Sequence, residues 1–278
     1  MSTVNTNELG CILVAKDMLS KTNNEAYYEV QQTEYPQKWD KPVVTYSMVR
    51  GTEDLPGDSM ERIAMNLAMT TWDLEIPLIL EVVKKSENPD ITLEFADNNS
   101  DPFFKERPSV LAYAYYPKTS KQGVIRFSDE HIWSLDGSPI PAPYDPSGKT
   151  TFKTYNLLHT LIHEIGHSLG LTHSEGAGLE KTVMYPFYNE QLDLTDYDID
   201  RIVAKYGSRQ WQHPAHYSRM KNWIKYRIRR FGSISGASQE AEKLRDELQF
   251  AKSEMGKKDA IIMEQLKVIM DLAKRVKQ

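Results

Sequence analysis

The chain has very little cysteine, with Cys11 alone among 278 residues. No disulfide can form within it, so folding does not depend on an oxidising compartment. Long apolar runs are also missing, and none approaches the roughly 18 residues that a membrane span requires. The N-terminus has no basic stretch, and the apolar run 11–15 is too short for the core of a signal peptide. We therefore predict neither a signal peptide nor a transmembrane segment.

A strong excess of positive charge is absent as well. The formal net charge is −5, which predicts no bulk affinity for nucleic acid, and we expect no nucleic-acid partner. With 40% hydrophobic residues the chain has enough apolar material for one domain of about 150–200 residues with shorter appendages.

The most informative motif reads HEIGHSLGLTH and begins at His163. Residues four apart share one face of an α-helix, so His163 and His167 can present two ring nitrogens to one ion. Zinc at about 2.0–2.1 Å per nitrogen fits this pair, and His173 would complete a three-histidine set that leaves a fourth position to water. Gly170 tolerates the left-handed backbone needed where the helix stops and the chain turns back. Glu164 is the candidate general base.

A helix with ordinary core or surface histidines is the alternative interpretation. Three histidines, a glutamate and a glycine in this register rarely arise by chance, so the motif favours a metal site. A methionine after a short loop, Met184, supports it, because a methionine in this place forms the floor of the metal site in metzincin peptidases.

These residues together resemble a matrixin, the catalytic domain of the matrix metalloproteinases. Ser174 follows the third histidine as it does in that family, and residues 184–188, MYPFY, resemble the family pattern M-Y-P-x-Y. The resemblance implies a zinc-dependent metalloendopeptidase, with Pro186 and Tyr188 in the wall of the S1′ pocket. It also implies that His159 occupies a position lining that pocket, where a ring would make the pocket shallower or more polar. A histidine hydrogen-bonded at the pocket base without influence on specificity is the alternative.

The resemblance predicts a matrixin-like zinc metalloprotease domain at 35–207 with an α+β fold. We expect a twisted, mostly parallel β-sheet with an antiparallel edge strand, two long helices and a C-terminal domain helix. The expected strands are 39–46, 79–84, 90–95 and 110–115. The expected helices are 58–73, a second that begins near 154–156, and a third that begins after a cap at Thr195. We expect a loop over 134–151. In the family, strand 110–115 forms the upper rim of the cleft, where a peptide adds as a further strand, so Leu111 and Ala112 are candidate substrate-binding residues.

The segment between Asn98 and Trp133 departs from the matrixin pattern. The family's structural zinc ligands are replaced by Asn98, Ser100, Tyr113 and Arg126, and calcium-binding positions are occupied by Lys105, Ser128 and His131. We therefore expect one catalytic zinc and neither the structural zinc nor that calcium. Our hypothesis is that Lys105 and Arg126 hold the loop by charge pairing or hydrogen bonding while Tyr113 fills volume; a looser loop is the alternative. For residues 129–131 we predict a solvated acidic turn rather than an ion site.

Residues 1–34 are polar and weakly patterned, and we interpret them as a leader or short pro-segment. Matrixin latency normally uses a propeptide cysteine on the zinc, and Cys11 is the sole candidate, but its neighbours lack the family's P-R-C-G-x-P-D pattern. An ordinary small apolar cysteine is therefore the favoured interpretation. The family is usually extracellular and no export signal is seen, so the location stays open.

The tail beyond the domain divides into three parts. Residues 208–231 are basic and aromatic, which suits contact with an anionic membrane or a helix packed on its own domain. Residues 232–238 form a linker. Residues 239–278 carry apolar positions at heptad spacing with one phase shift, which predicts a coiled-coil or amphipathic helix and hence a homo-oligomer or a helical partner.

The function predicted from the sequence is hydrolysis of peptide bonds in proteins, with water activated by zinc and Glu164, and with preference for an apolar P1′ residue. Two alternatives remain: a narrow-specificity protease recruited to one partner through the helical tail, and a non-catalytic, zinc-containing scaffold.

Overall fold

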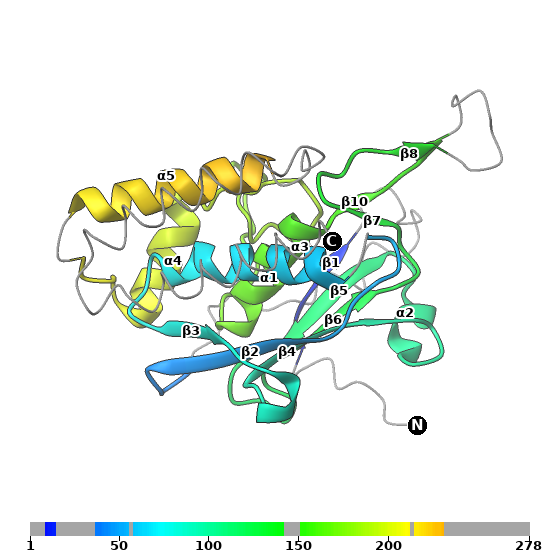
Figure 1. Ribbon diagram of the computed structural model, residues 1–278, viewed down its shortest axis with the longest axis horizontal. Coiled ribbons are helices and arrows are strands. Elements are labelled where there is room, and N and C mark those ends of the chain that lie inside the picture. The colour runs from blue at the N-terminus through cyan, green and yellow to red at the C-terminus, as the bar shows by residue number, and fades with distance from the viewer. Residues whose placement is uncertain (1–8, 15–36, 56–57, 142–150, 212–213, 231–278) are drawn as a thin grey trace.

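The computed structural model describes residues 9–14, 37–55, 58–141, 151–211 and 214–230 (Figure 1). The predicted linker and coiled-coil segment lie outside these residues. The elements in chain order are β1 Leu9–Val14, β2 Val43–Arg50, α1 Asp58–Asp73, β3 Ile79–Val82, a 3-10 turn Lys85–Glu87, β4 Ile91–Ala96, α2 Pro102–Glu106, β5 Val110–Tyr115, β6 Val124–Ser128, β7 Trp133–Ser134, β8 Ile140–Pro141, β9 Thr151–Phe152, β10 Tyr155–Asn156, α3 Leu157–Ser168, α4 Asp196–Tyr206 and α5 Pro214–Arg230.

The main sheet has six strands in the order β1-β5-β6-β4-β2-β3. Strands β3, β2, β4 and β6 run parallel, and β5 is antiparallel to β6, with Ala112 opposite Phe127. The parallel strands β2, β4 and β6 alternate buried and partly exposed residues over most of their length, whereas the antiparallel strand β5 is buried along its whole length. The mostly parallel sheet with an antiparallel strand beside it is the predicted α+β arrangement.

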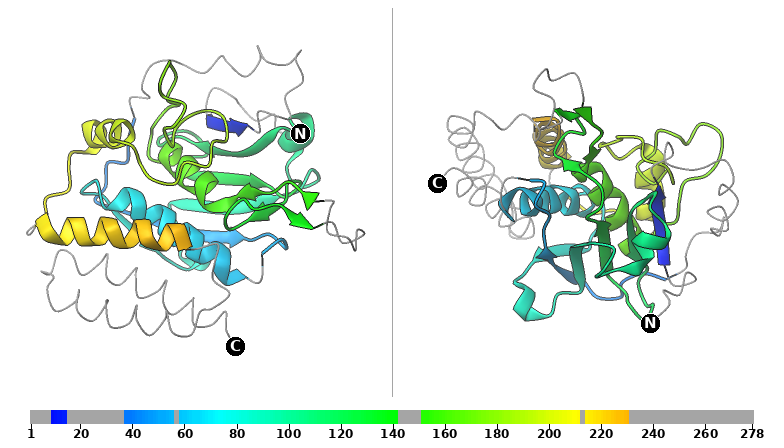
Figure 2. Two further views of the ribbon diagram at one scale, coloured as in Figure 1. Left: turned by 90° about the horizontal axis from the view of Figure 1, so that it is seen from above. Right: turned by 90° about the vertical axis from the view of Figure 1, so that its right-hand side faces the viewer.

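The sequence analysis expected β5 to be the edge strand of the sheet. In the structure it is not the edge, because β1 lies outside it. Strand β1 pairs with it antiparallel on its outer side, and the register places Cys11 opposite Ala114 and Leu13 opposite Ala112. Figure 2 shows β1 in dark blue along this border of the sheet. The segment 1–34, from which no strand was predicted, therefore supplies an additional strand, and only its residues 9–14 are described.

Helices α1 and α3 lie side by side on one face of the sheet (Figure 1). The helical spacing of apolar residues predicted α1 correctly at 58–73. Its buried stripe includes Ile63, Leu67 and Trp72, and the Trp72 indole N–H donates a hydrogen bond of 2.9 Å to the carbonyl of Ile162 in α3. This hydrogen bond and the shared core fix α3 against the sheet, so the position of the motif helix depends on α1.

Several predicted boundaries were shifted by a few residues. The first strand of the domain begins at Val43 rather than Trp39, whose indole instead donates to the Ser168 carbonyl at 2.9 Å. The expected loop 134–151 contains two short paired strands, β8 and β9. The basic aromatic segment forms α5, which packs on α1 through a buried face, as one of the two interpretations proposed. Within the described part of the chain, no helix has the length and apolarity to span a bilayer.

The loop after β4 is held by a charged network at the positions where the family pattern has metal ligands. Arg126 forms ion pairs with Asp101 at 3.0 Å and with Glu94 at 2.6 Å. The Tyr113 hydroxyl donates to the same Asp101 carboxylate, and its ring packs against Phe103 at 4.9 Å. The hypothesis for Arg126 and Tyr113 is supported by these contacts.

Lys105 does not behave as the hypothesis expected. It is exposed on α2, and no ion pair joins it to any residue that the structure describes. The Asp101 carboxylate forms its ion pair with Arg126 instead. It also caps α2 by accepting a hydrogen bond from the backbone N–H of Phe103. One buried aspartate thus joins the loop, the short helix and the sheet.

We predict that Arg126→Met lowers the free energy of unfolding by roughly 2–3 kcal/mol, because it leaves the Asp101 side chain, 4% exposed, as an uncompensated charge. Urea denaturation with a metal chelator present measures the loss without a contribution from bound ions. Lys118→Met is the control: it removes an exposed ion pair to Asp40 and should cost less than about 1 kcal/mol. Equal losses in the two variants would contradict a structural role for the network.

Candidate metal centre

Helix α3 carries the first two motif histidines on one face. The Asn156 side chain caps it by accepting from the His159 amide, and the helix ends at Ser168. Gly170 then takes φ +96°, and a Cβ at that position would lie 2.7 Å from the Gln37 carbonyl oxygen. A glycine is required there on both counts, and the turn brings His173 back to the helix as predicted.

Backbone carbonyls fix the tautomers of His163 and His167. The Nδ1 of His163 lies 2.7 Å from the Val183 carbonyl oxygen, and the Nδ1 of His167 lies 2.6 Å from that of Leu171. A carbonyl oxygen can only accept a hydrogen bond, so Nδ1 carries the proton in both rings and Nε2 keeps a lone pair. Two Nε2 acceptors are then left to face each other.

The three Nε2 atoms converge on one point. Those of His163 and His167 are 2.9 Å apart, and those of His163 and His173 are 3.3 Å apart. Lone pairs this close repel unless a cation lies between them, and tetrahedral zinc with Zn–N of about 2.0–2.1 Å spaces its ligands by roughly 3.3 Å. Within the described part of the chain, these three residues are the group that could hold a metal ion. The donor set therefore fits zinc.

Burial keeps the histidines neutral, which is the form that binds a metal. Desolvation lowers the pKa of His167 to about 3 and the pKa values of His163 and His173 well below their usual range. Glu164, the next residue in the helix, is also fully buried. The predicted ligands and the predicted base are thus brought together in a largely buried site, in which His173 keeps 9% of its surface exposed.

Met184 packs against the motif helix at Gly166. A Cβ on Gly166 would lie 2.4 Å from the Met184 sulfur and 3.0 Å from the Trp72 ring, so the helix approaches both side chains as closely as a glycine permits. The sequence analysis assigned no role to residue 166. In this structure it is a packing requirement of the methionine beneath it.

Two residues of α4 that were not predicted as site residues support the metal centre. The buried Asp198 carboxylate, which pairs with Thr195 in the predicted capping box, also accepts from the amides of Val183 at 3.1 Å and Met184 at 3.3 Å. It therefore holds the turn whose carbonyl orients His163. The capping pattern located Asp198, but only the folded chain reveals this second use.

Arg201 performs a similar task on the other side of the site. Its guanidinium donates hydrogen bonds to the Ser174 hydroxyl at 2.8 Å and to the Thr172 carbonyl at 2.9 Å, so it fixes the residues on both sides of His173. Its positive charge also contributes to lowering the pKa of His167 and His173. No sequence pattern identifies it, since its partners are nearly 30 residues away.

The predicted substrate-binding residues fall into two groups. The His159 ring is buried and lies edge-on to the Tyr188 ring with centroids 5.0 Å apart, and Pro186 is half-buried in the turn that leads to Tyr188. The Tyr188 hydroxyl accepts from the Asn156 amide at 2.7 Å. Leu111 and Ala112 are buried residues of β5, which lies between β1 and β6 in the sheet.

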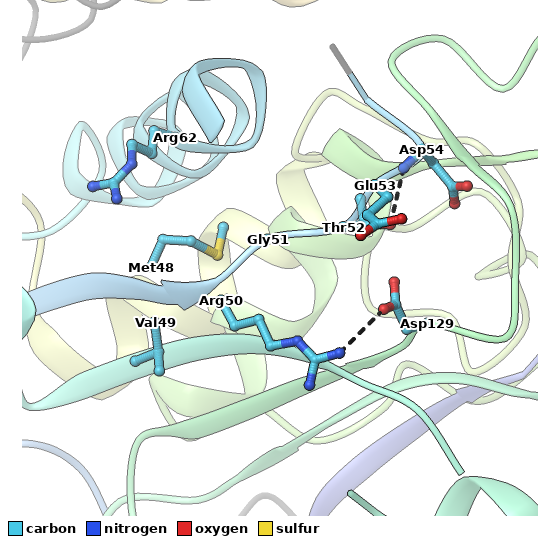
Figure 3. Close-up of a pocket in the computed structure, with 9 residues that line it drawn as sticks. All are labelled: Met48, Val49, Arg50, Gly51, Thr52, Glu53, Asp54, Arg62 and Asp129. Atoms are coloured by element: carbon cyan, nitrogen blue, oxygen red, sulfur yellow. Dashed lines mark hydrogen bonds and ion pairs between the residues drawn. The ribbon is translucent and has the colours of Figure 1, made fainter. Parts of the chain in front are cut away.

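The acidic turn after β6 does not form a metal cluster. His131 is buried, with Nε2 3.0 Å from the Val110 carbonyl oxygen, and Asp129 pairs with Arg50 at 3.6 Å. This ion pair lies in a polar cavity of about 600 Å³, which Figure 3 shows between the end of β2 and Asp129. None of the predicted site residues lines that cavity, so it is separate from the metal centre.

Comparison with known proteins shows which family the domain belongs to. A family model described as matrixin matches residues 38–207, which is more than half of the chain. The chain belongs to the matrixin family. It is 33% identical to stromelysin-1 of Mus musculus over 178 residues, which cover 62% of this chain and 33% of that protein. It is also 33% identical to matrilysin of Homo sapiens over 178 residues, 62% of this chain and 60% of that protein.

The interstitial collagenase of Oryctolagus cuniculus is 30% identical over 177 residues, 62% of this chain and 34% of that protein. The chain thus spans between about a third and three fifths of the relatives named here. Helix α5 lies beyond the part that matches the family model.

We predict that Gly166→Ala costs roughly 1–3 kcal/mol of stability, because the added methyl group overpacks the contact with Met184 and Trp72. In the double variant with Met184→Ala the clashing sulfur is removed, so the combined loss should be smaller than the sum of the two single losses. Urea unfolding of the four proteins of this double-mutant cycle measures the coupling. Additive losses would contradict direct packing of the sulfur on the helix.

Proposed function

We propose that this matrixin domain is a zinc-dependent endopeptidase that hydrolyses peptide bonds in proteins. The observation that carries the proposal is the convergence of three neutral imidazole Nε2 atoms next to a buried glutamate on the same helix. His163, His167 and His173 would hold the ion. A zinc ion bound there supplies a Lewis acid that activates water and polarises a carbonyl group.

Glu164 is the proposed general base. Its carboxylate would accept a proton from the attacking water and deliver it to the leaving amine, which balances the addition of water across the peptide bond. The surrounding burial excludes bulk water and strengthens the electrostatic effect of the carboxylate. Asp198 and Arg201 act indirectly, because they hold the backbone that positions the histidines.

For substrate recognition we propose an apolar P1′ residue packed against Pro186, Tyr188 and His159. The edge-on contact between the His159 and Tyr188 rings supports an aromatic pocket wall at this place. The backbone of Leu111 and Ala112 would pair with an extended peptide, which gives affinity with little sequence preference, while the pocket supplies selectivity.

We predict that the full chain binds about one zinc per molecule and cleaves a quenched peptide with an apolar P1′ residue, and that a chelator abolishes the cleavage. Glu164→Gln should lower kcat at least about 100-fold because the base is lost, while zinc content and unfolding are retained. Metal analysis and peptide kinetics test both statements. Unchanged kcat in Glu164→Gln would overturn the assigned role, and two zinc ions per chain would contradict the replacement of the structural zinc by Arg126 and Tyr113.

Access to the site involves β1. His163 and Glu164 have no exposed surface, and β1 both contacts α3 and occupies the outer side of β5. We propose that an extended substrate pairs with β5 in the antiparallel direction, which is the direction of β1, where Leu13 lies opposite Ala112. Backbone groups of β5 cannot pair with two strands on the same side, so we propose that a substrate peptide must displace β1.

Deletion of residues 1–14 should therefore lower KM for a short peptide roughly tenfold with little change in kcat, because the peptide no longer competes with β1 for the edge of β5. Ile12→Pro should act in the same direction, since proline removes a backbone donor within the strand. Asn5→Pro, outside β1, is the matched control. Initial-rate kinetics on the four proteins provides the test, and an unchanged KM in both β1 variants would show that β1 does not compete with the substrate.

A further inference from the structure

Helix α5 touches the chain segment that leads away from the S1′ wall. The helix packs on α1 outside the matched matrixin region, and its buried face contains Met220, Ile224 and Ile228 (Figure 1). Ile224 and Ile228 also line a small cavity together with Leu192 and Leu194. The apolar side of α5 therefore meets both α1 and residues 192–194.

Ionic contacts join α5 to the same segment. The Asp193 carboxylate lies 3.6 Å from the Lys225 ammonium and 3.2 Å from the Arg229 guanidinium. These groups are partly exposed, so each ion pair by itself stabilises the contact only weakly. Together with the burial of Leu194 they hold the backbone of residues 192–194 against α5.

The contact continues from residue 193 to the pocket histidine. The Gln191 side chain donates to the Asp193 carbonyl at 2.6 Å, and the Gln191 carbonyl oxygen lies 2.7 Å from His159 Nδ1. Because a carbonyl only accepts, Nδ1 of His159 carries the proton and the ring orientation follows the position of the Gln191 backbone. His159 in turn contacts Tyr188.

We propose that α5 is a brace for the S1′ pocket: it fixes residues 191–194 and, through the Gln191 carbonyl, the His159 ring, so that Ile228, Lys225 and Arg229 are positioning residues for P1′ selectivity. This inference rests on the proposed peptidase function. Its physical basis is that selectivity among apolar side chains depends on pocket shape, where a single methylene changes kcat/KM by about 10- to 200-fold. A wall that moves loses part of this discrimination.

The test compares kcat/KM for two peptides that differ only in leucine or alanine at P1′. In the zinc-loaded full chain, the Lys225→Ala/Arg229→Ala double variant should reduce the leucine-to-alanine ratio about threefold, and Ile228→Ala should reduce it further, through KM with kcat retained. Lys221→Ala is the matched control, because its ion pair at 3.1 Å joins the same helix to Glu75 rather than to Asp193. An unchanged ratio in the Ile228 and double variants overturns the proposal.

A second measurement does not depend on activity. In NMR spectra of the zinc-loaded Glu164→Gln protein, the His159 Nδ1 proton should give a slowly exchanging, hydrogen-bonded signal, assigned by its loss in His159→Gln. Adding Ile228→Ala, or the double substitution at 225 and 229, should accelerate its exchange severalfold, whereas Lys221→Ala should not. If no peptide is cleaved by the parent protein, the proposed peptidase function fails while this exchange rate still decides whether α5 braces His159; equal exchange in all variants would refute the brace.

Discussion

Two hydrogen bonds from imidazole rings to backbone carbonyls are the interactions on which the metal centre depends. The carbonyls of Val183 and Leu171 hold the Nδ1 protons of His163 and His167, and only then do lone pairs point at a common position. Such carbonyls are useful only if the backbone that bears them is itself fixed. Asp198 fixes the first by binding two consecutive amides, and the turn at Gly170 places the second.

The layers of the fold extend this support outward. Trp72 of α1 ties α3 to the core, Gly166 lets Met184 and Trp72 approach the helix, and Arg201 of α4 holds the residues around His173. The loop beside the sheet uses a different kind of support, in which Arg126 and Asp101 form a partly buried, charge-assisted cross-link. The centre is therefore rigid on every side that the described elements reach, which suits a site that must hold three ligands in one geometry.

The convergence of the three histidines could be predicted because it is encoded locally: His163 and His167 share a helix face, and Gly170 marks the reversal before His173. Helix α1 and the Thr195 cap were likewise predicted from short-range periodicity and capping. Gly166, Arg201 and the second use of Asp198 could not be, because their partners meet them only in the folded chain. The pairing of β1 was missed for a related reason, since a short apolar run next to polar residues specifies no partner strand.

Strand β1 is covalently joined to the domain whose sheet it extends. A tethered segment is present at an effective concentration that the tether sets, whatever the concentration of the protein. Diluting the protein would not release it, and a freely diffusing peptide with only main-chain affinity for β5 would rarely exceed that local concentration. Under the proposed competition between β1 and substrate, the tether sets an affinity threshold: ligands that also fill a side-chain pocket pass it, and generic extended chains do not.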